Sequence, residues 1–563
     1  MDIRVVVAID FGTTFSGFAY AYQDSEVITN DNWPQQIGPL KTNTVLQYDS
    51  NYQNVIKWGN PALAQRQSRR SRDISSSKTV ELFKLHLGNI SQNEKPPLPH
   101  QLSHEKAISD YLRELGKLIK ETVSTRWHGI KFFENVLLII SIPAEFDDIV
   151  KDTMRKCLHN AELTNSKESN KVEFTTEPEA AAIWCMRNLK EQNEVIPINA
   201  SFMVVDCGGG TVDLTTRKLL QNERLSEITE RTGDFCGGSY VDREFIKFLS
   251  RKLGESTINL LRKNNYGQMQ YMIQQFCQKL KFHFTGNQND FNPFEFDVEE
   301  ICPVLKQYCN DNIKEEMEDN DWIIDINFED LKSMFDPVIG KIIRLIRRQL
   351  KFNNDKCSAI FLVGGFSESK YLQMRVKEEF RRSVPSIVVP KQPIAAIVCG
   401  ACDYGLKMST IVDRTLKYTY GVRQGRIWKI GDPHSQKVTG FPNYTYAFDR
   451  LVVRGTKVGV DQEFSKTYTP LTPDVTRISF QIFKTTELNA EFCNESGMKL
   501  HGELIVDIPD IHLGLDREVE FSLIFGKMEL VAKAKNVRNG RIYNTSFDLD
   551  LFVIKNHDTF TSS

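Results

Sequence analysis

Two segments of the chain share one pattern of apolar and polar residues. Residues 4–9 and 201–205 are almost continuously apolar, which predicts strands buried on both faces of a sheet. Each run ends in an aspartate, Asp10 or Asp206, followed by a glycine turn, a threonine and a second apolar run. The pattern therefore predicts two similar strand–turn–strand loops and an internal duplication of the fold.

The segments between the two loops predict alternating helices and strands. Apolar residues recur with a helical period over residues 107–124, and the continuous apolar run at residues 136–142 predicts an inner strand. Thr176-Glu177-Pro178-Glu179 predicts the start of a helix that continues over residues 180–189. Glu177 at this helix start is placed either for capping or for catalysis.

After the second loop, residues 239–327 are polar and predict a helical subdomain, and residues 328–352 predict one long helix. Residues 360–363 predict a strand that ends in Gly364-Gly365, where a helix begins. Such a glycine pair lets a flat ligand or a phosphate lie against the backbone. The small residues at 393–401 permit close packing of a further helix.

Beyond residue 406 the pattern changes to short alternating stretches separated by turn signals. These stretches are residues 418–422, 451–460, 477–483, 499–508 and 518–535. We expect a separate all-β, sandwich-like domain. The predicted organisation is therefore an α/β domain over residues 1–405, a short linker at 406–415 and a β domain over 416–552.

Composition and charge narrow the classes of function. The chain has 563 residues, 40% of them hydrophobic and 26% charged, with a net charge of -2. Such a balance indicates a globular protein without the basic field that recruits nucleic acid or anionic membranes. A local basic cluster at Arg66, Arg69, Arg70 and Arg72 is interpreted as a solvated loop rather than a phosphate-binding or targeting segment.

The cysteines and the N-terminal residues indicate in which cellular compartment the protein is expected. Eleven scattered cysteines fit reduced, buried thiols better than a disulfide framework, and Cys399 with Cys402 is interpreted as core packing on one helical face. No charged-then-apolar leader occurs, and no apolar run reaches the ~18 residues that a membrane span needs. We expect a protein of the cytoplasm or nucleus.

The two loops carry the candidate chemistry. Backbone N–H groups at Gly12 and the hydroxyls of Thr13 and Thr14 can converge on an anion, while Asp10 can hold a divalent cation beside it. One such turn is most often only a hairpin. The recurrence of the pattern at Asp206 favours two loops that hold one magnesium-bound polyphosphate from opposite sides.

Lys84 is a second candidate, within the segment Thr79-Val80-Glu81-Leu82-Phe83-Lys84-Leu85-His86-Leu87-Gly88. From the residues alone a surface lysine is the favoured interpretation, and a desolvated lysine aimed at a phosphate is the alternative. The chain contains no Gly-Lys-Ser/Thr motif, which disfavours a Walker-type NTPase.

In their order along the chain, these features make residues 1–405 resemble the ATPase domain of the 70-kDa heat-shock chaperone family, whose fold is shared with actin and the sugar kinases. The resemblance implies an actin-like ATPase domain of two lobes with duplicated mixed sheets. Residues 79–88 match the family segment with the catalytic lysine, which implies that role for Lys84. Residues 142–146 resemble the family's proline-switch segment.

The resemblance also implies ATP or ADP with Mg²⁺ as the bound groups. Asp10 and Asp206 would hold the magnesium through its water shell, while Glu177 and Asp213 would position the attacking water or the metal's waters. The implied phosphate-binding residues are Gly12, Thr13, Thr14, Gly208, Gly209, Gly210 and Thr211, and Thr211 also belongs to the implied catalytic group. Lys281, Gly364, Gly365 and Phe366 would lie around the nucleoside.

The chain also departs from the family pattern. Gln278 stands where the family has a glutamate near the adenosine, although Lys281 matches. Phe366 and Glu368 replace a serine and the arginine that stacks on adenine, so that Phe366 could stack on the base instead. Residues 407–413 replace the leucine-rich acidic linker, and no helical lid is expected after the β domain, as in a divergent, lidless branch of the family.

The predicted function is an ATP-binding, slowly hydrolysing, magnesium-dependent chaperone-like ATPase whose nucleotide state biases lobe closure and the binding of a peptide or protein client by the β domain. One alternative is a nucleotide-sensing scaffold or signalling protein that binds a partner without folding clients. A small-molecule kinase of the same fold ranks last. Neither nucleic acid nor membrane is an expected partner.

Overall fold

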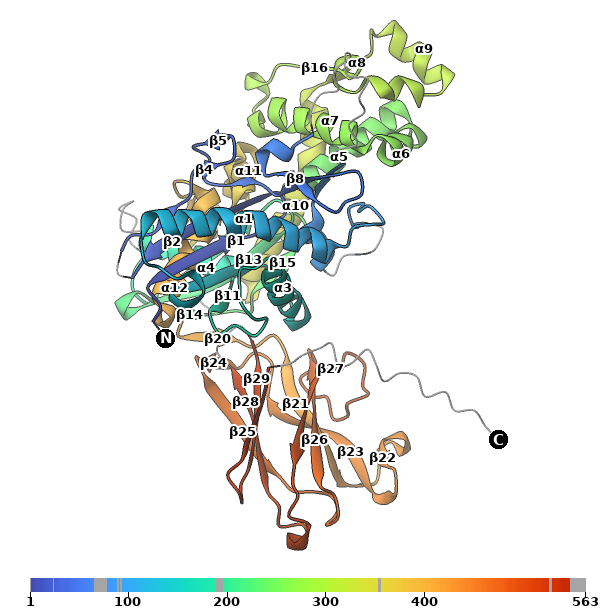
Figure 1. Ribbon diagram of the computed structural model, residues 1–563. Coiled ribbons are helices and arrows are strands. Elements are labelled where there is room, and N and C mark those ends of the chain that lie inside the picture. The colour runs from blue at the N-terminus through green and yellow to red at the C-terminus, as the bar shows by residue number, and fades with distance from the viewer. Residues whose placement is uncertain are drawn as a thin grey trace. The chain divides into compact units, whose positions relative to one another are not determined.

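The computed structural model describes residues 2–23, 25–64, 78–88, 91, 94–188, 196–352, 356–525 and 529–546. The chain forms two compact units (Figure 1). The first contains Met1–Glu223 and Arg231–Thr410, and the second contains Arg224–Glu230 and Ile411–Ser563. The predicted basic cluster around Arg66 to Arg72 lies outside the described residues.

The first unit contains one mixed sheet built around the first predicted loop. Its strands follow the order β11-β10-β1-β2-β3, with β6 also paired to β2. They span β1 (Val5–Asp10), β2 (Phe15–Tyr22), β3 (Ile28–Thr29), β6 (Thr42–Asn43), β10 (Val136–Ile142) and β11 (Val172–Thr176). β1 runs antiparallel to β2 and parallel to β10, and all residues of β1 and β10 are buried, as their apolar runs predict.

A second mixed sheet is built around the second loop. β12 (Ser201–Cys207) runs antiparallel to β13 (Val212–Leu220) and parallel to β18 (Cys357–Val363). β19 (Ser386–Val388) pairs in parallel with β18, and β15 (Thr232–Asp234) pairs with β13. The strand directions around β12 therefore match those around β1.

Two helices with small residues pack closely beside the first sheet. α4 (Glu177–Asn188) lies against α12 (Ala396–Leu406), and α12 also lies against β1 and β10. A Cβ atom on Gly400 would lie 1.8 Å from the carbonyl oxygen of Ala180. The close packing that the small residues predict is therefore confirmed. Two further helices of this part are α1 (His104–Arg126) and α3 (Asp148–Asn160).

The predicted helical subdomain is also confirmed, with one short hairpin inside it. Its elements lie together at one end of the first unit (Figure 1). They are α5 (Ser239–Leu253), α6 (Glu255–Asn264), α7 (Tyr266–Lys279), β16 (Phe294–Asp297), α8 (Val298–Ile301), α9 (Asp311–Asp319) and β17 (Ile323–Ile326). The predicted long helix is α10 (Phe328–Phe352). Stacked rings of Phe245 and Phe276, 4.0 Å apart at their centroids, lie in the core of this region.

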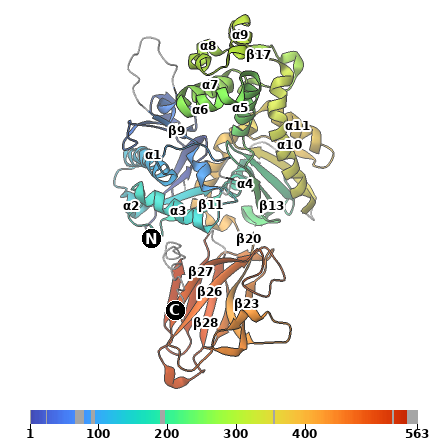
Figure 2. The ribbon, with the colours of Figure 1, turned by 90° about the vertical axis from the view of Figure 1, so that its right-hand side faces the viewer.

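In the second unit, the regular elements of the described residues are strands and three-residue 3-10 turns (Figure 2). One sheet has the order β22-β23-β21-β26-β27 and another the order β25-β28-β29-β30. The strands are β21 (Thr419–Ile427), β22 (Lys437–Val438), β23 (Phe441–Val452), β25 (Gln462–Tyr468), β26 (Arg477–Thr485), β27 (Lys499–Asp507), β28 (Val519–Phe525), β29 (Val531–Asn536) and β30 (Ile542–Ser546). One hydrophobic core draws on both sheets, and Phe480 stacks on Phe521 at 4.6 Å within it.

A short segment from the middle of the chain belongs to this second unit. Leu225 of β14 (Arg224–Glu227) forms an isolated β-bridge with Ile411. Ile411 lies just before β20 (Asp413–Thr415), which pairs with β24 (Lys457–Gly459). The backbone N–H of Glu227 and the Ser226 hydroxyl both donate to the Asp413 carboxylate at 2.9 Å. Arg454 donates two hydrogen bonds to Glu230, at 2.7 and 2.9 Å.

All eleven cysteines are free thiols, as the sequence predicts. Among the described residues, no helix combines the length and apolar character required to cross a lipid bilayer.

Candidate functional site

The two predicted loops face each other at contact distance. A Cβ atom on Gly209 would lie 2.1 Å from the Thr14 hydroxyl oxygen, and one on Gly210 would lie 2.5 Å from the Thr13 hydroxyl oxygen. Both approaches are shorter than any side chain allows, so the second loop needs glycine at these two positions. The structure thus brings together Gly209, Gly210, Thr13 and Thr14, which the sequence analysis assigns to one phosphate site.

The strand directions explain why the carboxylates meet. Asp10 ends β1, and Glu177 directly follows β11 at the same edge of the first sheet, because β1, β10 and β11 are parallel. In the second sheet, Asp206 lies near the end of β12, and Gly364 directly follows the parallel strand β18. Across β12 and β13, Asp206 pairs with Asp213.

Gly364 closes one side of the second loop. Its backbone is in the left-handed region, at φ 84°, and a Cβ atom there would lie 2.3 Å from Oδ1 of Asp206. Glycine at this position therefore leaves the Asp206 carboxylate room. Gly365, the next residue, is exposed.

The start of α5 supports the second loop from another side. The backbone N–H groups of Gly237, Gly238 and Ser239 donate to the carbonyl oxygens of Gly210, Gly208 and Gly209, at 3.1, 2.9 and 2.8 Å. A further bond joins the Gly208 N–H to the Thr211 carbonyl at 3.0 Å. These bonds fix the conformation of the second loop through its carbonyl groups.

Lys84 is buried and paired with Glu177. Its Nζ lies 2.8 Å from Oε1 of Glu177, and both residues are 5% exposed. The ammonium also lies 5.8 Å from the ring centroids of Phe11 and Phe146. The interpretation of Lys84 as a surface lysine is therefore wrong, because the turn that carries it points into the first unit.

Glu177 is not used as the helix cap. The Thr176 hydroxyl accepts the N–H of Glu179 at 3.3 Å and so performs the capping at the start of α4. The carboxylate of Glu177 is directed to Lys84 instead.

Asp213 is held from the predicted proline-switch segment. The backbone N–H of Ala144 donates to Oδ1 of Asp213 at 2.8 Å. Oδ2 of Asp213 and Oδ1 of Asp206 are buried and have no hydrogen-bond partner in the described part of the chain. Each of these two carboxylates therefore keeps one buried oxygen without a protein donor among the described residues.

Lys41 is a site residue that sequence reasoning missed. Its Nζ lies 2.5 Å from Oδ2 of Asp10, and the two side chains are 7% and 2% exposed. Lys41 lies in a loop with no periodic pattern and no motif, so only the three-dimensional contact reveals it.

Burial and mutual repulsion shift the pKa values of the carboxyl groups upward. Burial raises the pKa of Asp206 well above its ordinary value, and the charges of Glu177, Asp213 and Asp10 add to that shift. Burial, followed by repulsion from Glu177, raises the pKa of Asp213 to about 7. Burial also raises the pKa of Glu177, although the Lys84 ammonium opposes this shift. Added positive charge would therefore reduce the electrostatic repulsion among these carboxylates.

This donor set can hold a divalent cation together with waters and phosphate oxygens, but not as a cage of protein ligands alone. Within the described residues, no three or more His, Cys, Asp or Glu side chains converge as a ready metal cage. The partnerless oxygens of Asp206 and Asp213 are hard acceptors of the kind that Mg²⁺ prefers. Because Mg²⁺ usually keeps several waters and binds through one or two carboxylates plus phosphate oxygens, these residues fit it.

The predicted nucleoside residues lie beside the second loop. Lys281 Nζ donates to the Gly238 carbonyl and to Asp242, both at 2.7 Å. Phe366 is 8% exposed, and its ring lies 3.2 Å from the position of a Cβ on Gly238 and 6.4 Å from the Phe335 centroid. Gln278 and Glu368 are exposed. The Phe366 ring thus forms part of the core under the glycine turn.

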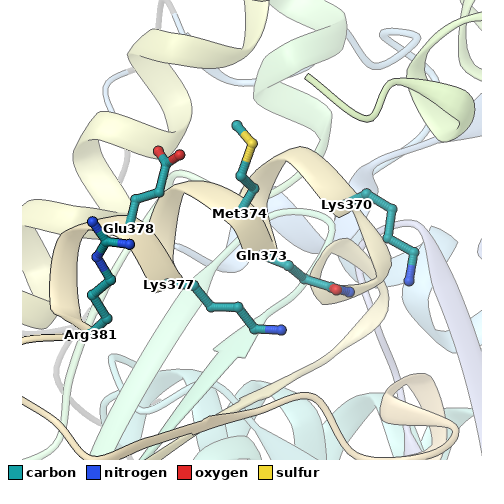
Figure 3. A pocket seen from close by; sticks show the side chains of 6 residues that line it. All are labelled: Lys370, Gln373, Met374, Lys377, Glu378 and Arg381. Carbon is teal, nitrogen blue, oxygen red and sulfur yellow. The ribbon is translucent and has the colours of Figure 1, made fainter. Parts of the chain in front are cut away.

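A surface hollow of about 390 Å³ lies apart from these residues, along α11 (Lys370–Phe380) (Figure 3). It is lined by Lys370, Gln373, Met374, Lys377, Glu378 and Arg381. None of the predicted site residues lines it.

The chain is similar in sequence to heat-shock and chaperone proteins. The chain is 24% identical to mouse heat shock 70 kDa protein 12A and 24% identical to human heat shock 70 kDa protein 12B, over 97% of this chain and 91% of each relative. It is also 23% identical to the chaperone protein HscA of Buchnera aphidicola, over 73% of both chains.

The chain is a divergent relative of the 70-kDa heat-shock family. Its similarity to the heat shock 70 kDa protein 12 branch extends over both units, whereas the similarity to HscA covers less of the chain. Residues 198–389 also match a family described as a domain of unknown function (DUF8340), a range that includes the second glycine loop and Gly364.

Proposed function

We propose that the protein is a magnesium-dependent ATPase of chaperone type, which binds ATP between its two glycine loops and hydrolyses it slowly. The observation that carries this proposal is the contact of Gly209 and Gly210 with Thr14 and Thr13, in a site that also has electrostatically coupled, buried carboxylates. The relatives named as heat-shock and chaperone proteins support the same assignment.

The proposed architecture is an actin-like ATPase domain over residues 1–405, with two duplicated lobes, followed by a linker and a β-sandwich over 416–552. The matching strand directions around β1 and β12 support the duplication. The shared core of the two sheets in the second unit supports the sandwich.

In this proposal the backbone N–H groups of the loops and the hydroxyls of Thr13, Thr14 and Thr211 bind the phosphates. Mg²⁺, when bound, would neutralise the phosphate charge that builds up as the γ-phosphoryl group is transferred. Asp206 offers it an oxygen without a hydrogen-bond partner, whereas Asp10 is paired with Lys41.

The remaining residues orient the reaction. Glu177 holds Lys84 in place, and the ammonium has further N–H donors with which it can reach a phosphate oxygen. Ala144 fixes one oxygen of Asp213, which leaves Oδ2 to accept a hydrogen bond from the attacking water. The base lies against Gly364 and the exposed Gly365, next to the wall that Phe366 and Lys281 support.

The second unit is proposed to bind a peptide or protein client, with the nucleotide state biasing that binding. A nucleotide-sensing scaffold in the cytoplasm or nucleus, which binds a partner without folding clients, is the second candidate. Residues 407–413, which replace the leucine-rich acidic linker of the family, favour this candidate. ATP-dependent suppression of client aggregation would count against it.

Titration calorimetry of the full chain with ATP, ADP and GTP in the presence of Mg²⁺ tests the binding site. Turnover of ATP by the parent, Lys84→Ala and Asp206→Ala then tests the chemistry, with Lys370→Ala as a matched control on the exposed face of α11. We expect both site variants to lose at least tenfold in turnover. Equal rates in all four proteins would refute the catalytic assignment, and absence of ATP binding would refute the whole proposal.

A further inference from the structure

Lys41 is held against the first loop by its neighbours in sequence. β6, which begins directly after it, pairs with β2 through Thr42 and Ser16. The N–H of Thr44 donates to the Thr14 carbonyl and the Thr44 hydroxyl donates to the Gly12 carbonyl, both at 2.9 Å. The backbone after Lys41 is thus bonded residue by residue to the loop that is proposed to bind phosphate.

The side chain of Lys41 also has a defined path. A Cβ atom on Gly17 would lie 2.9 Å from Cγ of Lys41, so glycine at position 17 makes room for the aliphatic stem. The ammonium then reaches Asp10, which is paired with Gly17 across β1 and β2. A lysine placed this way is part of the site and not a surface residue that happens to reach inward.

The charges of the site divide between its two halves. Four buried carboxylates lie within electrostatic range of one another there, on Asp10, Glu177, Asp206 and Asp213. The two on the first sheet each have an ammonium partner, Lys41 at 2.5 Å and Lys84 at 2.8 Å. The two on the second sheet each retain a buried oxygen with no hydrogen-bond partner among the described residues.

The influence of Lys41 extends beyond Asp10. Its positive charge opposes the upward pKa shifts of Glu177, Asp206 and Glu368, so the ammonium lies within electrostatic range of both loops. A fixed charge in such a buried position acts more strongly than one in water, because the surrounding dielectric is low.

We propose that Lys41 is a tethered cation of the phosphate site, which uses Asp10 as its counterion and contributes positive charge to the bound polyphosphate. The divalent cation is then held from the second loop, by Asp206, and nucleotide binding keeps a part that does not require the metal. The inference rests on the proposed function, and it gives Asp10 a different role from the magnesium ligand that the family resemblance implies.

Calorimetric titration of the full chain with ATP, once with saturating Mg²⁺ and once with EDTA, tests the inference. The proteins are the parent, Lys41→Gln, Lys41→Arg and the control Lys370→Gln. We expect the parent and Lys370→Gln to bind ATP in EDTA. Lys41→Gln should lose roughly 10- to 100-fold of that affinity and less in Mg²⁺, as expected for one charge-assisted hydrogen bond. Lys41→Arg should keep most of the binding in EDTA.

A double variant controls for misfolding of Lys41→Gln, because that substitution leaves the Asp10 carboxylate buried without its partner. Asp10→Asn/Lys41→Gln removes both charges together, and its thermal unfolding curve reports whether the fold is kept. We expect this variant to retain Mg²⁺-dependent ATP binding and to lose binding in EDTA.

The outcomes separate the inference from the function on which it rests. An unchanged ratio of the EDTA and Mg²⁺ affinities in Lys41→Gln would overturn the role of Lys41 while leaving ATP binding intact. Loss of all binding by the parent in EDTA, or of Mg²⁺-dependent binding by a folded double variant, would overturn it as well. If the parent binds no ATP under either condition, both the inference and the proposed function fail.

Discussion

Gly209 and Thr14 show at the residue scale how the two loops depend on each other. For Gly209→Ala we expect ATP affinity to fall at least tenfold and the free energy of unfolding to fall by about 1–3 kcal/mol, because the new methyl group would overlap the Thr14 hydroxyl. Calorimetry and urea unfolding measure the two effects. Gly267→Ala is the matched control, since nothing lies within 4 Å of its Cβ position; a similar loss there would refute the steric argument.

Asp403 on α12 provides a pH-dependent test that does not involve the site. Burial raises the pKa of Asp403 to about 6, and its ion pair with Arg187 only partly opposes the shift. A carboxyl group with a raised native pKa binds its proton more tightly in the folded state, so its contribution to stability is complete below about pH 4 and is lost as the pH rises through about 6.

We therefore expect the free energy of unfolding of the parent, measured relative to Asp403→Asn, to fall by up to about 3 kcal/mol between pH 4 and pH 7. Urea unfolding of both proteins across this range measures the difference. A constant difference would mean that Asp403 ionises in the folded protein as it does in the unfolded chain.

Individual site residues differ in how well sequence reveals them. Asp10, Asp206, Glu177 and Gly364 each lie at or next to the end of a buried strand, and strand ends can be predicted from apolar runs. The ion pairs could not be predicted from that pattern, because Lys84 lies 93 residues from Glu177 in the chain and Lys41 lies 31 residues from Asp10. Pairing across such distances depends on tertiary packing.

At the scale of elements, α4 connects the core of the first unit to the site, because the helix begins at Glu177. Its neighbour α12 approaches at Gly400, where a Cβ would meet the Ala180 backbone, which cannot rotate away. Any change that separates these helices should therefore also move the carboxylate that holds Lys84.

We expect Gly400→Ala to lower the free energy of unfolding by about 3 kcal/mol and to weaken ATP binding as well. Thermal or urea unfolding, followed by calorimetry of the folded fraction, measures both. Gly340→Ala in α10 is the control: its nearest neighbour is the flexible end of Arg344 at 3.5 Å, and alanine favours a helix interior by up to about 1 kcal/mol. Equal effects of the two substitutions would contradict the packing argument.

The elements themselves are predictable where their pattern is strong. Helix α10 has the predicted bounds because its apolar residues recur over 25 positions. In contrast, β25 (Gln462–Tyr468) was not predicted, since most of its side chains are polar and exposed and alternate too weakly to stand out from a loop. This strand forms because it pairs with β28, although its local sequence does not favour a strand.

On the scale of the whole molecule, the segment Arg224–Glu230 lies in the second unit and is flanked in the chain by residues of the first unit. It follows β13, which begins beside the second glycine loop, and precedes β15 and the Gly237 turn. Its contacts in the second unit include Asp413 and Arg454. A change in the loop therefore has a short covalent route to the second unit.

If this route couples the two units, ATP should change protease cleavage around residues 406–415, and Arg454→Ala should reduce that change. The Arg454–Glu230 pair is partly exposed, so we expect its loss to cost no more than about 1 kcal/mol of stability. Timed proteolysis with and without ATP measures the coupling. Arg477→Ala, which removes a more exposed pair with Asp507, is the control, and an identical ATP response in all proteins would argue for independent domains.

Because Arg224–Glu230 belongs to the second unit, the choice of fragment matters when the two units are to be studied separately. The chain passes between the units after Glu223, after Glu230 and after Thr410. A fragment that stops at residue 405 would present this segment without Asp413, Thr415 and Arg454, its partners in the second unit. A full-length chain nicked once near residue 410 would instead keep them, so the two pieces should migrate as one species on a native gel and separate only in denaturant.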